Sequence, residues 1–347
     1  MTRKWLCALG ILASAAVLSA QQRWLTTADR NLVSDGVWTE FPLPNPASGP
    51  TTIALAADGS AWFTEGSGNR IGRINPDGRA PDALKEFPLP NANSSPRIIA
   101  LGSDGNMWFS EHTGNRMGRI APDGTIAEFP IPTPNSMPRA IALSADGNIW
   151  FGEFGGGKIG KVTPQGVITE YPIPTPDSGP RALAAGPDGN VWFSEFNASK
   201  IGRITPDGKI TEFEMPRPNS GPGDITAGAD GHMWFLELNG QMDGRKVDGN
   251  RVGRITMDGK ITEFPIPSAT GSPTNIAVGP DRNIWFTKGG VVGRVTPDGA
   301  ITEVPMPPNS GGTGLTAGSD RQPPRRISNR LWVASSGGNK LLYLTFK

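Results

Sequence analysis

Charged side chains recur at two fixed positions of a motif that repeats along this chain. Three residues after a tryptophan, most copies of the motif carry a charge, at Glu65, Glu111, Glu153, Glu195, Glu237 and Lys288. Directly after a proline, three of these copies also carry arginine, at Arg97, Arg139 and Arg181. In a fourth copy, the next residue after that position is acidic, Asp224. Guanidinium and carboxylate groups gathered at one concave mouth can orient a polar ligand.

Two interpretations of these charges stay open. In the first, the arginines and glutamates form ion pairs that rim a channel and hold neighbouring repeats in register. In the second, the irregular half of the pattern marks a single site, because the arginine series stops after Arg181 and Lys288 reverses the charge of the glutamate series. The second interpretation predicts an asymmetric pocket, lined by Arg181, Glu195, Asp224, Glu237 and Lys288.

Other kinds of catalytic site find little support in the sequence. The chain has two histidines: His112 follows Glu111 and could titrate near neutral pH, whereas His232 follows a turn. With one cysteine, Cys7, in the N-terminal segment, neither a Cys-His nor a Ser-His-Asp system is indicated. Carboxylates alone could bind Mg²⁺ or Ca²⁺, with Glu195 and Glu237 as candidate ligands, although the neighbouring arginines oppose a cation.

The elements that must position these residues are short strands. A segment typified by Ile168–Lys209 recurs with a period of about 42 residues, and each copy contains one of the tryptophans Trp62, Trp108, Trp150, Trp192, Trp234, Trp285 and Trp332. One copy predicts four strands, at Ala140–Leu143, Asn148–Glu153, Lys158–Thr163 and Val167–Pro174. Seven such units predict an all-β, seven-bladed β-propeller with four-stranded antiparallel blades.

The two ends of the chain complement each other. Val37–Pro44 matches the fourth strand of a unit but stands alone, whereas the last unit ends at Leu341–Phe346 without a fourth strand. We therefore expect the N-terminal strand to close the ring. The top face should carry the charged series and an insertion, Asn239–Gly249, expected as a flanking loop. Shorter insertions at Arg79–Leu84 and Arg321–Asn329 should lie on the bottom face.

The N-terminal segment predicts export. Arg3 and Lys4 precede an apolar run of 14 residues, Trp5–Leu18, and Ala20 offers a small residue for cleavage. We expect a signal peptide at 1–20, a polar lead-in at 21–36 and the propeller at 37–347, with a periplasmic or extracellular location; an uncleaved anchor is the alternative. The net charge of +1 gives no indication of a nucleic-acid partner. We expect a monomer with no membrane span after signal removal.

The repeat ITEYPIPTPDSGPRALAAGPDGNVWFSEFNASKIGRITPDGK resembles that of the virginiamycin B (streptogramin B) lyase family, from Val37 to Phe346. The resemblance implies a propeller that opens a cyclic depsipeptide at its ester by elimination, with Mg²⁺ and a histidine base. In the lyases, histidine follows the proline that begins a unit in two neighbouring blades, and glutamate precedes it in one. Here Thr51, Arg97, Arg139, Arg181, Gly223 and Thr274 follow those prolines, and Gly49, Ser95, Met137, Gly179, Gly221 and Ser272 precede them.

Because the histidines and the glutamate of the lyases are replaced at these positions, the expected function differs from that of the lyases. We expect a lyase-like propeller that binds a small molecule, peptide, protein or glycan on its top face without the elimination chemistry. One alternative is a divergent lyase that opens a cyclic ester or lactone with Mg²⁺ and the surviving glutamates. The other is an interaction scaffold with no small-molecule site.

Overall fold

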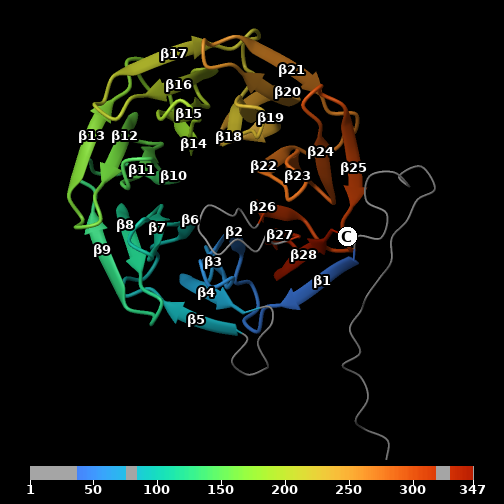
Figure 1. Cartoon of the computed structure of the whole chain (residues 1–347). Coiled ribbons are helices and arrows are strands. Elements are labelled where there is room, and N and C mark those ends of the chain that lie inside the picture. Colours follow the sequence, from blue (N-terminus) through green and yellow to red (C-terminus); the bar gives the residue numbers. More distant parts are fainter. Residues whose placement is uncertain (1–36, 76–83, 318–328, 347) are drawn as a thin grey trace, which may run out of the picture.

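The chain folds as a ring of seven four-stranded antiparallel sheets. The computed structural model describes residues 37–75, 84–317 and 329–346, and these contain 28 strands (Figure 1). The predicted seven-bladed propeller is confirmed. The predicted signal peptide and lead-in, most of the Arg79–Leu84 insertion and all but the end of Arg321–Asn329 lie outside the described residues. In the described part of the chain, no helix is long and apolar enough to cross a membrane.

Each blade runs from an inner strand at the central channel to an outer strand at the rim. The first three blades contain β2 (Pro50–Leu55), β3 (Ala61–Glu65), β4 (Arg70–Ile74), β5 (Leu84–Pro88); β6 (Pro96–Leu101), β7 (Met107–Glu111), β8 (Arg116–Ile120), β9 (Ile126–Pro130); and β10 (Pro138–Leu143), β11 (Ile149–Glu153), β12 (Lys158–Val162), β13 (Ile168–Pro172). The next three contain β14 (Pro180–Ala185), β15 (Val191–Glu195), β16 (Lys200–Ile204), β17 (Ile210–Glu214); β18 (Pro222–Ala227), β19 (Met233–Met242), β20 (Arg245–Ile255), β21 (Ile261–Pro265); and β22 (Pro273–Val278), β23 (Ile284–Lys288), β24 (Val291–Val295), β25 (Ile301–Pro305). The seventh contains β26 (Gly312–Ala317), β27 (Arg330–Ser335), β28 (Lys340–Thr345) and β1 (Val37–Pro42).

One packing unit repeats in the blades and explains why the tryptophan is the most constant residue. In blade 4, Trp192 is fully buried, donates from Nε1 to Asp188 at 3.1 Å and stacks on Phe213 with ring centroids 5.5 Å apart. The Arg203 guanidinium covers the same indole at 5.2 Å. Opposite Phe193, position 202 is glycine because a Cβ there would collide with the phenylalanine ring. Large buried rings thus replace a single central core.

Neighbouring blades share their hydrophobic clusters. Trp150 of blade 3 packs with Leu183 and Phe193 of blade 4, and the other tryptophans lie between blades in the same way. Between the last blade and the first, Trp332 and Leu341 pack with Ile53 and the other members of that cluster. The propeller is therefore held by a belt of interfaces around the ring.

The ring closes where the sequence predicts. β1 pairs antiparallel with β28 from Val37 opposite Thr345 to Pro42 opposite Lys340. Beyond the strand, the Leu43 amide donates to the Asn339 carbonyl at 3.0 Å. The first strand of the chain thus covers the edge that the last strand would otherwise expose.

The insertion in blade 5 differs from the flanking loop that we expected. β19 and β20 continue as a ladder past the blade, with Gln241 opposite Lys246, and turn at Asp243-Gly244. Both turn residues have positive φ, 49° and 81°, as the tight turn of a two-residue hairpin requires. The Asp-Gly pair and the alternating residues around it make a hairpin that projects from the top of the ring.

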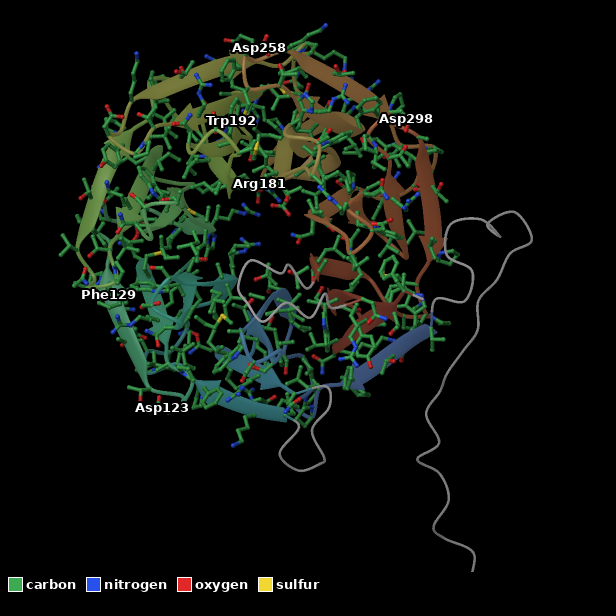
Figure 2. The ribbon with its side chains drawn as sticks, viewed as in Figure 1. Asp123, Phe129, Arg181, Trp192, Asp258 and Asp298 are labelled. Atoms are coloured by element: carbon green, nitrogen blue, oxygen red, sulfur yellow. The ribbon has the colours of Figure 1, made fainter. Side chains whose placement is uncertain are left out.

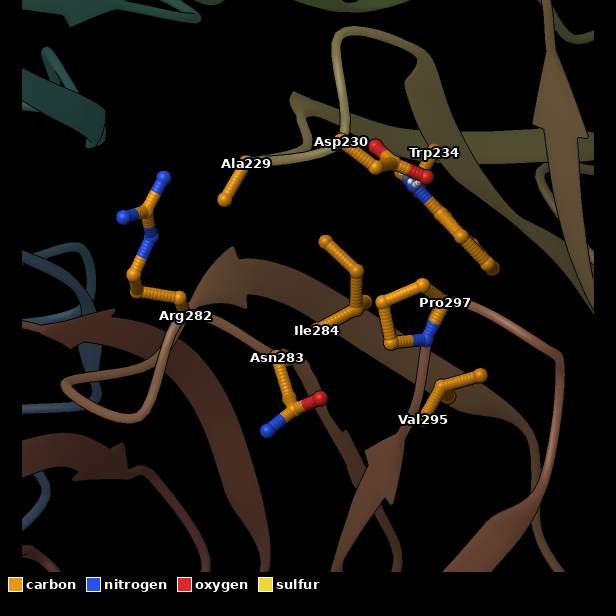
Figure 3. Close-up of a pocket in the computed structure, with 8 residues that line it drawn as sticks. All are labelled: Ala229, Asp230, Trp234, Arg282, Asn283, Ile284, Val295 and Pro297. Atoms are coloured by element: carbon orange, nitrogen blue, oxygen red, sulfur yellow. Dashed lines mark hydrogen bonds between the residues drawn. The ribbon is translucent and has the colours of Figure 1, made fainter.

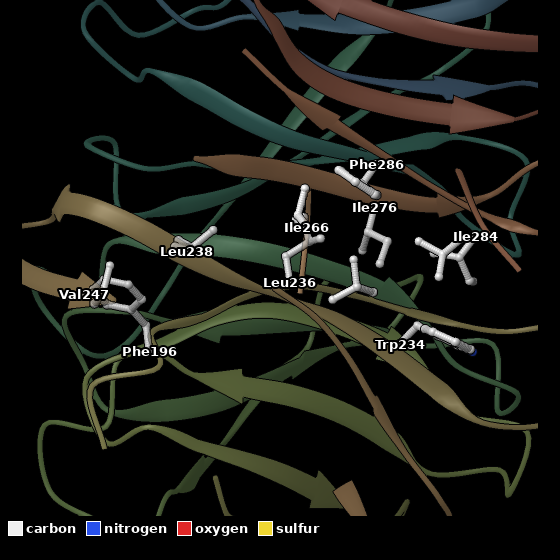
Figure 4. Close-up of a cluster of buried hydrophobic side chains, with 11 residues drawn as sticks. Phe196, Trp234, Leu236, Leu238, Val247, Ile266, Ile276, Ile284 and Phe286 are labelled. Atoms are coloured by element: carbon white, nitrogen blue, oxygen red, sulfur yellow. The ribbon is translucent and has the colours of Figure 1, made fainter. Parts of the chain in front are cut away.

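The base of this hairpin is anchored in the largest hydrophobic cluster. Leu238 and Val247 are both buried, and Val247 lies beside Phe196 from blade 4 (Figure 4). The Leu238 amide donates to the Gly221 carbonyl at 3.0 Å and the Asp248 amide to the Asn219 carbonyl at 3.2 Å. These contacts hold the hairpin over blade 4.

Candidate functional site

Three arginines meet at the top of the central channel. Arg97, Arg139 and Arg181 each occupy the second position of an inner strand, in β6, β10 and β14. Figure 2 shows Arg181 toward the middle of the ring, whereas Asp123, Asp258 and Asp298 lie at its rim. The equivalent position on three successive inner strands therefore gathers three cations at one mouth.

A single aspartate from the blade 5 hairpin reaches this cluster. Asp243 Oδ2 accepts a hydrogen bond from Arg139 at 3.0 Å and a second from Arg181. The aspartate comes from the hairpin tip, so blade 5 bridges blades 3 and 4 across the mouth. In the described part of the chain, the Arg97 guanidinium has no ion pair of its own.

Phenylalanine rings fix the two paired arginines. The Arg139 guanidinium lies 4.9 Å from the Phe154 ring centroid and the Arg181 guanidinium lies 5.0 Å from that of Phe196. The two rings themselves are 6.4 Å apart. Stacking on an aromatic face restrains a guanidinium while leaving its edge free to donate hydrogen bonds.

The cluster holds three guanidinium groups, and two carboxylates, Asp243 and the nearby Asp224, oppose their charge. Burial, and then the charges of Arg139 and Arg181, lower the pKa of Arg97 to about 10. Burial and the charge of Arg139 likewise lower the pKa of Arg181 to about 10. The pKa of Asp243 is lowered despite its partial burial, because Arg181 and Arg139 favour its charged form. The mouth is thus an electrostatically favourable place for an anion.

His112 lies beside the arginines in an unreactive state. Its Nδ1 lies 3.3 Å from the Pro138 carbonyl, which fits an Nδ1–H donor. Burial, and then the charges of Arg97 and Arg139, lower the pKa of His112 to about 4. The sequence suggested titration near neutral pH, whereas this environment keeps the imidazole neutral and a weak proton acceptor.

Asp224 lies near the cluster but its oxygens are used by the backbone. Oδ1 accepts from the Ile225 amide at 3.1 Å and Oδ2 from the Ile276 amide of blade 6 at 3.0 Å. At the equivalent position of blade 1, Thr52 Oγ1 accepts a hydrogen bond from the Ile99 amide of the next blade at 3.1 Å. This ring position therefore ties one inner strand to the next, and its being acidic in blade 5 does not by itself indicate a ligand.

The glutamate series points away from the channel mouth. All five carboxyl groups are fully buried near the outer strands, and each lies beside a second glutamate, in the pairs Glu65–Glu86, Glu111–Glu128, Glu153–Glu170, Glu195–Glu212 and Glu237–Glu263. Burial is the first cause that raises the pKa of Glu195 to about 9, and the charge of Glu212 is the second. No described group donates a hydrogen bond to either oxygen of Glu195, so a buried negative charge there would be uncompensated and the neutral form is favoured.

Lys288 belongs to this outer series as well. Its ammonium donates to Asn250 Oδ1 at 2.6 Å and to the Ser268 carbonyl, and Glu303 is the opposing charge. In the other charged blades a cation of the next strand lies opposite the glutamate, such as Lys200 opposite Glu195, whereas Val291 is opposite Lys288. The lysine therefore supplies from β23 the cation that β24 lacks at this position.

The structure thus separates residues that the sequence grouped. Arg181 and Asp224 lie near the mouth, whereas Glu195, Glu237 and Lys288 contact outer strands and loops, so the five do not line one pocket. Arg139 and Arg181 pair with Asp243 rather than with the glutamates, and Arg97 has no ion pair, so the predicted arginine–glutamate rim is also absent from the described residues. Sequence reasoning missed Asp243, although its Asp-Gly pair in the insertion was a signal for a hairpin tip.

The donor set at the mouth does not fit Mg²⁺. The described residues contain no group of three or more histidine, cysteine or acidic side chains that could hold a metal ion. Asp224 is engaged by backbone amides, Asp243 by arginines, and Glu195 and Glu237 are buried elsewhere. A cation would also meet three guanidinium groups.

A small recess on the described surface is a poor candidate for a ligand site. It lies between blades 5 and 6, lined by Asp230, Trp234, Ile284, Pro297 and their neighbours (Figure 3). It has room for about one water molecule. Asp230 there accepts from Trp234 Nε1 at 3.1 Å, the bond that the repeat makes in other blades.

Comparison with known proteins agrees with the fold and the repeat. The Virginiamycin B lyase family matches this chain over residues 17–245 and 176–345. Crystalline selenomethionine-substituted virginiamycin B lyase from Staphylococcus aureus is 35% identical, with a TM-score of 0.81, over 90% of this chain and 100% of that one. A catalytically inactive histidine-to-alanine variant of that lyase, crystallised with quinupristin, matches equally, at 35% identity and a TM-score of 0.81.

A curated relative matches over a much shorter segment. Virginiamycin B lyase of Bacillus licheniformis is 50% identical over 40 residues, which is 12% of this chain and 14% of that relative. The matched part of this chain therefore covers about one seventh of the relative's length. Taken with the match along almost the whole described propeller, the chain belongs to the Virginiamycin B lyase family.

Proposed function

We propose that this chain is a ligand-binding member of its family that does not carry out the elimination reaction. The observation that carries the proposal is the convergence of Arg97, Arg139 and Arg181 on the mouth of the channel. The lyase resemblance implies histidines at post-proline positions of this face. Arginine stays protonated in proteins and is unsuited to act as a base, but it binds ligands well.

His112, the histidine near the mouth, supports the same proposal. A general base works best when its pKa lies near the operating pH. The pKa of His112 is about 4, because burial and two guanidinium groups oppose its protonation. The acidic residues near the mouth are engaged by backbone amides or arginines, so the metal-assisted step implied by the resemblance also lacks its donors.

The direct test is an assay on a streptogramin B antibiotic. We expect no linear elimination product by mass spectrometry after incubation of the purified protein with quinupristin and Mg²⁺. The Staphylococcus aureus lyase, assayed in parallel, provides the positive control, and a His112→Ala variant provides the matched control. Product that forms with the wild-type chain and disappears in His112→Ala would refute the proposal and identify His112 as the base.

A further inference from the structure

The charge imbalance at the mouth indicates what kind of ligand fits there. The charges of Arg139 and Arg181 act on Arg97, the charge of Arg139 acts on Arg181, and Asp243 is the carboxylate that Arg139 and Arg181 share. Asp224 adds a second negative charge that acts on Arg181, because hydrogen bonds from backbone amides do not remove the charge of a carboxylate. Three guanidinium groups therefore face two carboxylates. The surplus charge at this mouth is therefore positive.

The arginines are also held ready before any ligand arrives. Arg139 is 8% exposed and lies against Phe154, and Arg181 lies against Phe196, which packs on Val247 of the hairpin. Restraining these long side chains in advance lowers the entropy that a ligand must remove on binding. The planar guanidinium fork matches a carboxylate better than a neutral oxygen.

Asp243 shows how a carboxylate is received at this place. It lies on an exposed two-residue turn, and its side chain contacts Arg139 and Arg181 through one oxygen, Oδ2. The hairpin is anchored at its base by Leu238 and Val247, and near its tip Arg245 donates to the Asn197 carbonyl. The aspartate can therefore lose its contacts with the arginines while the base of the hairpin stays in place.

We infer that the mouth binds a small ligand carrying two or more carboxylates, one held by Arg97 and another that competes with Asp243 for Arg139 and Arg181. This inference rests on the proposed ligand-binding function and adds the chemical class of the ligand. Asp243 then acts as an internal competitor that weakens binding of an acidic ligand. Removing its charge should strengthen binding, whereas removing the charge of Arg97 should weaken it.

Propane-1,2,3-tricarboxylate is a suitable probe, measured by isothermal titration calorimetry at low ionic strength. We expect Asp243→Asn to bind it about tenfold more tightly than the wild type, because asparagine tolerates the positive φ of this turn and cannot compete as an anion. Adding Arg97→Gln to Asp243→Asn should weaken binding about tenfold. Lys246→Gln is the matched control: it removes a positive charge from an exposed site on the same hairpin and should change little.

The outcomes separate this inference from the proposed function. The inference would be overturned if folded Asp243→Asn did not bind the tricarboxylate. It would also be overturned if Arg97→Gln and Lys246→Gln changed the affinity for the tricarboxylate equally. Equal binding of the corresponding triamide, insensitive to Arg97→Gln, would also overturn it and leave a ligand-binding mouth of another class. Tighter binding of inorganic phosphate than of the tricarboxylate would refute the carboxylate assignment. The antibiotic assay tests the absence of elimination independently, and the melting temperature of each variant verifies folding.

Discussion

At the scale of single residues, the outer series shows that a charge reversal can preserve an arrangement. Glu195 is opposite Lys200 across its strand pair, whereas Lys288 is opposite Val291. In both blades a glutamate of the outer strand, Glu212 or Glu303, interacts with the cation. The cation lies on the third strand of blade 4 and on the second strand of blade 6, and in both blades it faces a glutamate of the outer strand.

Lys288→Glu should therefore destabilise the fold. The lysine is 1% exposed, so its replacement leaves a buried carboxyl near Glu303 and removes the donor to Asn250 and Ser268. Leaving buried polar groups without their partner in this way costs about 1–3 kcal/mol of unfolding free energy, measurable by chemical denaturation. Adding Val291→Arg, which copies the arrangement of the other blades, should recover part of the loss. The exposed substitution Lys246→Glu serves as the control, and equal stability of it and Lys288→Glu would contradict the assignment.

At the scale of elements, the sequence predicted almost all of the strand order. Fixed spacing of tryptophans and turn residues determines the blades, and the unmatched strands at the two ends determine closure. The blade 5 insertion was interpreted as a loop, although Asp243-Gly244 forms a hairpin turn.

The direction of side chains was harder to predict from the sequence. Pro180 is opposite Glu195 in the ladder, yet Glu195 points to the outer strand and Arg181 to the channel. A register shift after Pro180 interrupts simple alternation, and repeat spacing carries no information about it.

Ring closure by β1 makes a prediction at this scale. Deleting residues 37–44 removes six ladder positions on β28 and the side chain of Trp38, which is 3% exposed in the cluster between blades 6 and 7. We expect a large fall in melting temperature, or failure to fold. Trp38→Ala, which keeps the strand, should cost about 3–5 kcal/mol. The control is Val167→Ala, at a residue that is 62% exposed. A deletion variant that melted with the wild type would show that β1 is dispensable.

At the scale of the whole molecule, the blades place a partly protonated layer of acids around the ring. Burial is the largest cause that raises the pKa of each glutamate in the outer series: Glu65, Glu111 and Glu237 to about 7, Glu153 to about 8 and Glu195 to about 9, from an ordinary 4.5. The belt of blade interfaces thus encloses carboxyl groups that are partly protonated near pH 7, and Glu153 and Glu195 are the most fully protonated of them. The arginine mouth, in contrast, remains charged.

This layer predicts that the propeller loses stability as the pH rises from 7 to 9. The folded chain retains protons that the unfolded chain releases above about pH 4.5, so the stabilisation is complete at low pH and is lost through the raised pKa values. Each additional proton released on unfolding costs about 1.4 kcal/mol per pH unit. His112, whose pKa is lowered to about 4, acts in the opposite direction, but only below about pH 6.5.

We expect the melting temperature of the wild type to fall across pH 7–9. The melting temperature of Glu195→Gln, which cannot ionise at that position, should fall less and should exceed that of the wild type at pH 9. Asp177→Asn, at an exposed carboxylate in the loop that leads into the same blade, should keep the wild-type slope. A wild-type melting temperature that stayed level or rose over this range would mean that the buried glutamates are ionised in the folded chain.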